Sequence, residues 1–409
     1  MAIEPTGSVY LLGAGFSKAI SAAMPVMGEL AAEVLDELDR DREVLRPFND
    51  DLESWLSYLS SPQPWLSESQ NLRNRAEYFD VSRAILTMID RDEQLVLRES
   101  APVWLQRLVW NMSEESADVL TLNYDLLLER AAMSLRRTSG FSDLYVAPLT
   151  QRMKPGSGIM ISRSEAPGAR ISLHKLHGST NWYGGPPGSD SVPVCVVRDN
   201  GVWGPDETQF VPPDRYADLQ PMITPPVAVK TPFYNSQALR AGWIRAAQAL
   251  QSTKHLTVIG YSLPITDNSM AALVTMSLHQ AAGVTIVDRS AATVKRISDL
   301  LPGHKVVSYV GPTAVSDYVG ETCPQHVEWG IDILEDGSQV PNVVVDGSPV
   351  PQRKLPDLTG LDGPENWNTE QRFARWVGTQ WPDVTSQRLP SERWVHPGGI
   401  GFAYVASGI

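Results

Sequence analysis

The sequence is poor in cysteine and lacks two kinds of apolar segment. Cys195 and Cys323 are its 2 cysteines among 409 residues, which argues against a disulfide framework and suits a reducing compartment. No basic-then-apolar leader stands at its start, and no apolar run approaches the roughly 18 residues that a membrane helix needs. These absences lead us to expect a cytoplasmic protein with no membrane partner.

Positive charge is also scarce. The 34 Lys and Arg residues face 47 Asp and Glu residues, which gives a formal net charge of −13 at pH 7. Such a balance argues against a protein that coats nucleic acid or anionic membrane, so we expect no direct nucleic-acid binding. Hydrophobic residues still make up 42% of the chain, enough for a substantial core and, at this length, for two or three domains.

Short apolar runs rich in β-branched residues alternate with helix-compatible stretches. Four runs are typical of buried parallel strands, and a fifth is expected to end the sheet: 8–12, 118–122, 255–259, 284–287 and 305–310. Three of these runs are followed by stretches with helical character, at 126–136, 268–280 and 291–301. The alternation predicts an α/β fold with a doubly wound, parallel Rossmann-type sheet.

About a hundred residues separate the first two predicted strands, far more than one crossover helix needs. Helical periodicity within this gap, over 28–45, 52–59, 73–97 and 102–110, predicts a helical insertion at residues 28–117. Residues 138–235 are rich in Gly, Pro and Ser, and we expect a module of loops with short strands there, beside the site.

The character of the chain changes beyond residue 311. This part has 13 acidic and 6 basic residues and contains 5 of the 12 tryptophans. ILEDGSQVP (333–341) is echoed by VVVDGSPVP (343–351), with a hairpin-type Asp-Gly turn in each copy. We therefore expect a catalytic domain at 1–310 and a small β-rich accessory or interaction domain at 311–409.

A Gly-Ala-Gly turn follows the first predicted strand, within YLLGAGFSKA (10–19). Gly13 and Gly15 would let the backbone approach a phosphate at a helix N-terminus, or would form only a tight turn. The dinucleotide fingerprint requires a third glycine at position 18, where this chain has Lys18, and no Gly-Lys-Ser/Thr follows as in a P-loop. The turn by itself leaves both interpretations open.

Polar motifs stand at the ends of the other predicted strands or in the loops between them, and open α/β sheets bind ligands outside the carboxyl ends of their strands. They are TLNYD (121–125), KLHGS (175–179), GYSLPITD (260–267) and VDRS (287–290). Together with GAGFS (13–17), and in this order, they resemble the sirtuin-like NAD-consuming proteins of bacteria, many of which are anti-phage defence effectors. The resemblance covers roughly residues 5–25 and 115–310, and it implies a sirtuin-like Rossmann sheet.

The resemblance implies a role for each motif. Asn123 and His177 match the catalytic pair, and an imidazole with an unperturbed pKa of about 6.5 suits a general base near neutral pH. The nucleotide-binding residues that it implies are Gly13, Ala14, Gly15, Phe16, Ser17, Gly260, Ser262 and Asp288. From the residues alone, Asn123 could instead cap the next helix, His177 could be a core or loop histidine, and Asp288 could be a loop carboxylate.

The sequence departs from the sirtuin deacylases after His177. Those enzymes carry a four-cysteine zinc ribbon there, whereas this chain has Cys195 alone in that neighbourhood, so we expect no metal site. The resemblance then implies an NAD glycohydrolase that uses NAD as its substrate. An NAD-dependent protein deacylase and a non-catalytic sensor of NAD or ADP-ribose are the alternatives. We further expect a gated defence effector that forms a homo-oligomer and responds to a second defence protein or a phage trigger.

Overall fold

The computed structural model describes residues 7–151, 171–184, 194–205, 220–224, 236–264, 267–333, 338–382, 385–388, 391–396 and 399–404. The chain forms two compact units, one of Met1–Ala101 with Met112–Tyr318 and one of Pro102–Asn111 with Val319–Ile409. The domain division expected at residue 311 stays a prediction. Among the described residues, no helix combines the length and the apolar character needed to cross a membrane.

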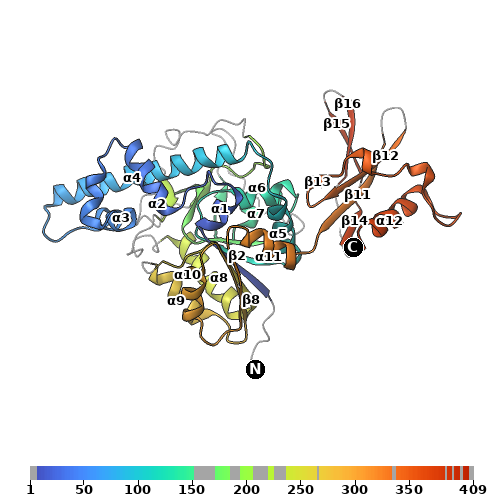
Figure 1. Ribbon diagram of the computed structural model, residues 1–409. Coiled ribbons are helices and arrows are strands. Elements are labelled where there is room, and N and C mark those ends of the chain that lie inside the picture. Colours follow the sequence, from blue (N-terminus) through green and yellow to red (C-terminus); the bar gives the residue numbers. More distant parts are fainter. Residues whose placement is uncertain are drawn as a thin grey trace. The chain divides into compact units, whose positions relative to one another are not determined.

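A six-stranded sheet forms the centre of the first unit (Figure 1). In spatial order its strands are β10 (Val306–Val310), β9 (Gly283–Asp288), β8 (Thr253–Ile259), β1 (Gly7–Leu12), β2 (Asp118–Thr121) and β4 (Ser172–Lys175). All neighbouring strands run parallel, which confirms the predicted α/β class and parallel sheet. The five predicted strands are present with β10 at one edge, and β4 is an additional strand at the other.

Helices alternate with these strands along the chain. They are α1 (Ala14–Ile20), α6 (Leu127–Ser134), α7 (Phe141–Leu144), α8 (Gln237–Ser252), α9 (Asn268–Ser277), α10 (Ala291–Leu300) and α11 (Ala314–Thr322). Figure 1 shows α8, α9 and α10 gathered beside β8. Ala246 and Leu250 of α8 belong to one apolar core with Val9 and Leu120 of the sheet, so α8, which the sequence analysis did not assign, covers the central strands.

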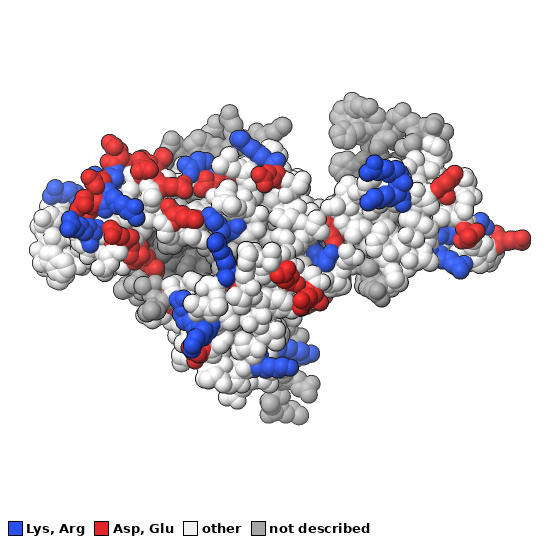
Figure 2. All heavy atoms as spheres, viewed as in Figure 1, with Lys and Arg blue, Asp and Glu red and all other residues white. Residues whose placement is uncertain are grey.

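The predicted helical insertion connects α1 to β2. It contains α2 (Met27–Glu37), the 3₁₀ helix η1 (Arg42–Phe48), α3 (Leu52–Ser60), the long α4 (Glu68–Val96) and α5 (Val103–Glu114). The stretch predicted as one helix over 28–45 is divided between residues 37 and 42, where Asp39 adopts a left-handed φ of 51° that a helix cannot contain. Figure 2 shows acidic and basic side chains interleaved over the insertion.

Short strands of the predicted loop-rich module form a second sheet in the first unit. Its strands, in spatial order, are β3 (Thr150–Gln151), β6 (Cys195–Val196), β5 (Gly178–Gly184) and β7 (Gln220–Ile223). β5 is buried along its whole length. The rest of the predicted module, 152–170, 185–193, 206–219 and 225–235, lies outside the described residues.

The second unit is built on a four-stranded sheet. Its strands, in spatial order, are β13 (Ser348–Pro349), β12 (Gln339–Val345), β11 (His326–Ile333) and β14 (Thr385–Arg388). The remaining elements are η4 (Gln352–Lys354), η5 (Leu358–Gly360), α12 (Thr369–Gln380) and the hairpin of β15 (Ser391–His396) and β16 (Gly399–Tyr404). Phe373 and Val377 of α12 form a core with Val327 and Val343 of the sheet.

One of the two predicted Asp-Gly turns lies within the described residues. Asp346 and Gly347 have φ angles of 49° and 75°, as a two-residue hairpin turn requires, and they connect β12 to β13. The first Asp-Gly pair, at 336–337, lies outside the described residues, although β11 and β12 on either side pair antiparallel. The second unit is thus rich in β structure, as predicted, and it also contains α12 and most of α5.

Candidate functional site

The five sequence motifs lie at one edge of the parallel sheet. Gly13 directly follows β1, Gly260 directly follows β8, and Asp288 is the last residue of β9. Asn123 and His177 each stand two residues beyond their strands, β2 and β4. Because the strands are parallel, all five positions share the carboxyl edge of the sheet, where open α/β sheets bind ligands.

The glycine turn packs against the backbone that follows β8. The amide of Gly15 donates to the Gly260 carbonyl over 2.8 Å, and a Cβ at Gly13 would lie 2.6 Å from Cα of Tyr261. Gly260 has a φ of +60°, and a Cβ there would overlap the amide nitrogen of Phe16. Close approach of two backbone segments therefore accounts for these glycines without a ligand, while Ala14 at the tip of the turn is exposed.

Asn123 connects the second strand to this turn. Its Nδ2 donates to the Gly13 carbonyl and to Ser17 Oγ, both over 2.9 Å. A carbonyl oxygen only accepts hydrogen bonds, so the contact with Gly13 fixes which way the amide of Asn123 faces. Asn123 is half-buried, and among the described residues its Oδ1 has no hydrogen-bond donor. This oxygen is free to accept from a bound molecule.

Asp125 takes the capping role that was an alternative for Asn123. Its Oδ1 accepts from the amide of Leu127 in the first turn of α6 over 3.2 Å, and its Oδ2 accepts from Ser17 Oγ over 2.7 Å. Burial raises the pKa of Asp125, and the ammonium of Lys175 opposes that rise. Ser17, which was predicted as a phosphate contact, is buried and joins Asn123 to Asp125.

His177 lies in a buried turn between β4 and β5. Its carbonyl accepts from the amide of Thr224 over 2.7 Å. Gly178 has a φ of +85°, and a Cβ there would overlap the Met222 carbonyl oxygen, so the chain can turn after His177 only through glycine. Two aromatic rings lie near the imidazole of His177, with ring centroids 6.4 Å away at Tyr124 and 6.5 Å away at Trp243.

Two further predicted residues differ in their surroundings. Asp288 is half-buried, and its Oδ1 accepts from the amide of Ser290 over 2.7 Å at the start of α10. Burial raises its pKa, and the hydrogen bond from Ser290 opposes the rise. Ser262 is exposed, and Leu263 beside it adopts a left-handed φ of 46°, which is strained for a branched side chain.

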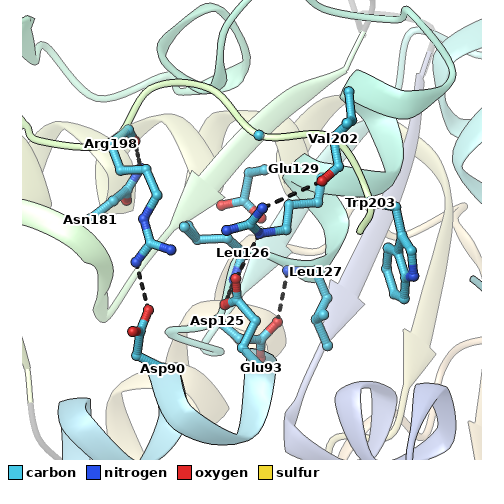
Figure 3. Close-up of polar contacts among 12 residues, drawn as sticks. Asp90, Glu93, Asp125, Leu126, Leu127, Glu129, Asn181, Arg198, Val202 and Trp203 are labelled. Carbon is cyan, nitrogen blue, oxygen red and sulfur yellow. Dashed lines mark hydrogen bonds and ion pairs between the residues drawn. The ribbon is translucent and has the colours of Figure 1, made fainter. Parts of the chain in front are cut away.

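A set of buried charged side chains, not predicted from the sequence, lies in and beside the loop that follows Asn123, and Figure 3 shows Glu93, Asp125 and Glu129 among them. Its members are Glu93, Asp125, Glu129, Arg130 and Lys175. The guanidinium of Arg130 lies 2.8 Å from Glu93, and the ammonium of Lys175 lies 3.0 Å from Glu129. Charged residues directly beside apolar ones in LLLERAA (126–132) and SLHK (172–175) were the signal for it.

Comparisons with known proteins give a distant likeness. No protein-family model and no curated protein sequence matches the chain. Among solved structures, a Sir2 homologue in complex with NAD is similar at 15% identity and a TM-score of 0.39, over 77% of this chain and 88% of that one. A structure of a Sir2 enzyme, described for its mechanism and regulation, is similar at 13% identity and a TM-score of 0.37, over 77% and 91% of the two chains. The function proposed below rests on the residues themselves.

Proposed function

We propose that this protein is an NAD glycohydrolase, which cleaves the bond between nicotinamide and ribose. The observation that carries the proposal is the setting of Asn123. Its amide is fixed by the glycine turn through Nδ2, and Oδ1 stays free at the sheet edge that also holds His177. These two residues occupy the positions of the catalytic pair in the motifs that resemble the sirtuin-like NAD-consuming proteins.

In the proposed reaction, the bond from C1′ of the ribose to the nicotinamide nitrogen breaks, and nicotinamide leaves with the electron pair. The ribose passes through an oxocarbenium-like cation, as in glycoside hydrolysis. Water then forms the new C1′–O bond and yields ADP-ribose. Asn123 Oδ1 accepts a hydrogen bond from the ribose or from that water, and His177 accepts the proton that the water loses.

Three of the remaining predicted residues bind the rest of the substrate. Ala14, exposed at the tip of the glycine turn, and the exposed Ser262 contact the phosphates, while Asp288 accepts hydrogen bonds from the adenosine ribose. The amide of Gly15 already donates to the Gly260 carbonyl, so it contributes through the shape of the turn and not as a phosphate donor. NAD is the substrate, and the reaction as proposed uses no metal.

The experiment that tests this function resolves the products by chromatography after the full chain has been incubated with NAD, with and without an acetyl-lysine peptide. A glycohydrolase releases nicotinamide and ADP-ribose, linear or cyclic, whether or not the peptide is present. Nicotinamide release that requires the peptide and yields an acetylated ADP-ribose would show a deacylase instead. Binding of NAD without turnover would show a sensor.

We also propose that the activity serves anti-phage defence and is gated. An NAD-depleting enzyme that is always active would drain its own cell, so a resting state of low activity is needed. The insertion and the second unit provide surface for a homo-oligomer, a second defence protein or a phage trigger. Comparing NAD loss with and without phage lysate, using the full chain, tests this regulation.

A further inference from the structure

The helical insertion supplies one fully buried carboxylate to the Asn123 loop. Glu93 lies in the last turn of α4, more than 25 residues before the loop, and its side chain is 0% exposed. Its Oε1 accepts from Nε of Arg130 over 2.8 Å, and its Oε2 accepts from the amide of Leu126 over 2.8 Å. Both oxygens of one carboxylate are therefore occupied by donors from α6 and the residue that precedes it (Figure 3).

Leu126 directly precedes α6, so its amide has no hydrogen-bond acceptor within the helix. The N-terminal amides of a helix need acceptors, and a carboxylate there is also favoured by the helix dipole. The carboxylate of Glu93 accepts from the amide of Leu126, and the carboxylate of Asp125 accepts from the next amide, that of Leu127. The start of α6 is thus held by two carboxylates, one from its own loop and one from the insertion.

The fixed segment reaches back to Asn123. Lys175 donates to the carbonyl of Asp125 over 2.5 Å, and Ser17 donates to the carboxylate of Asp125 over 2.7 Å. Asn123 stands three residues before Leu126 and donates to the same Ser17. A shift of the Leu126 amide would therefore move Asp125 and, through Ser17, change the direction of the Asn123 amide.

We propose that Glu93 is a positioning residue for Asn123, through which the helical insertion forms part of the active site. The inference rests on the proposed NAD glycohydrolase function. A misplacement of about 1 Å in a reacting group can cost roughly 100-fold in rate, so the position of this loop bears directly on turnover. Glu93 itself is fully buried and acts only through the loop.

The test uses the double variant Glu93→Met/Arg130→Met in the full chain. Removing one partner of a buried ion pair leaves an unpaired charge, whereas replacing both with apolar residues of similar size often preserves the fold. The variant still deprives the Leu126 amide of its acceptor. Asp80→Asn, which changes an exposed carboxylate on the same helix, is the matched control.

We expect kcat for NAD hydrolysis to fall by roughly 10- to 100-fold in the double variant, while KM stays within about twofold because the phosphate and adenosine-ribose contacts are elsewhere. In an Asn123→Ala background the same double variant should lower kcat no further, since Glu93 acts through Asn123. Hydrogen exchange of the Leu126 amide should become faster. Asp80→Asn should change none of these.

An unchanged kcat, or a loss of kcat that adds fully to that of Asn123→Ala, would overturn the role of Glu93. If the wild-type protein releases no nicotinamide, the proposed function fails. Hydrogen exchange then decides the role of Glu93 by itself, because an unchanged rate at Leu126 in the double variant would show that Glu93 does not hold the loop.

Discussion

The side chain of Asn123 is bound on one side by the protein and open on the other. Nδ2 donates to Gly13 and Ser17, and Oδ1 accepts no hydrogen bond from the described residues. We predict that Asn123→Ala lowers kcat for NAD hydrolysis by roughly 10²–10⁴, the usual contribution of a positioned polar group. NAD should still bind, because the phosphate contacts lie elsewhere, and calorimetry measures this directly. A variant that turns over NAD at the wild-type rate would remove Asn123 from the mechanism.

Asp288 allows a prediction about pH. Burial raises its pKa from an ordinary value of 3.8, so the carboxylate becomes protonated at a higher pH than an exposed aspartate. In the proposed complex its ionised form accepts hydrogen bonds from the ribose hydroxyls, so KM for NAD should rise as the pH falls through the raised pKa. Asp288→Asn keeps an oxygen for the Ser290 amide and should show a higher KM that no longer responds to this titration, with kcat little changed.

The measurement is the pH profile of KM for both proteins. A profile in which the wild type and Asp288→Asn have the same KM at neutral pH would show that Asp288 does not bind the substrate. It would leave this residue as the loop carboxylate that holds the start of α10.

At the scale of elements, the contact between the glycine turn and the end of β8 determines how α1 sits on the sheet. Gly260 has a φ of +60° and no room for a Cβ next to Phe16. We predict that Gly260→Ala lowers the free energy of unfolding by about 2–4 kcal/mol, through left-handed strain and overlap. Gly303, with nothing within 4 Å of its Cβ position, is the control, and Gly303→Ala should be near neutral.

Denaturant unfolding of the two alanine variants provides the comparison. Equal free energies of unfolding for Gly260→Ala and Gly303→Ala would mean that the backbone around Gly260 can move to accommodate a Cβ. Packing would then not require the glycines at 13 and 15. They would then be better explained by a ligand.

The central strands could be predicted from sequence because burial on both faces leaves continuous apolar runs, as in β1 and β9. The edge strand β4 was not placed in the sheet, because SLHK is short and half polar. The buried ammonium of Lys175 in β4 is paired with Glu129, which comes from a different element, and donates to the Asp125 carbonyl. A pair like this is separated by 46 positions, so local pattern does not reveal it. Glu93 was missed for the same reason.

The motif residues were easier to find than their partners. The carboxyl ends of parallel strands meet at one edge, so Asn123 and Asp288 could be grouped from strand positions alone, whereas His177 follows β4, which was not predicted as part of the sheet. Which atom of Asn123 stays free depends on Gly13 and Ser17, more than a hundred positions away. Their catalytic and binding roles stay predictions.

At the scale of the whole molecule, residues 102–111 form one unit with 319–409. Cutting the chain near residue 312 would separate these segments, so regulation is better tested in the full chain. If assembly switches the enzyme on, we predict that nicotinamide release per mole of protein rises with protein concentration, in step with oligomer mass. Mass photometry and rate measurements over the same concentration range check this. A constant specific rate across a change in oligomer mass would exclude assembly as the gate.

The most direct test of the proposed NAD glycohydrolase activity compares two histidine variants. His177 lies at the carboxyl ends of the parallel strands. His304 precedes β10 and therefore lies at the amino ends, where its Nδ1 is 2.9 Å from the Ala282 carbonyl oxygen. The measurement is the rate of nicotinamide release from NAD by the full chain, by His177→Ala and by His304→Gln. We predict equal rates for the wild type and His304→Gln, and a rate lower by roughly 10²–10⁴ for His177→Ala with NAD binding retained. Near-wild-type turnover by His177→Ala, or no turnover by the wild type, would contradict this prediction.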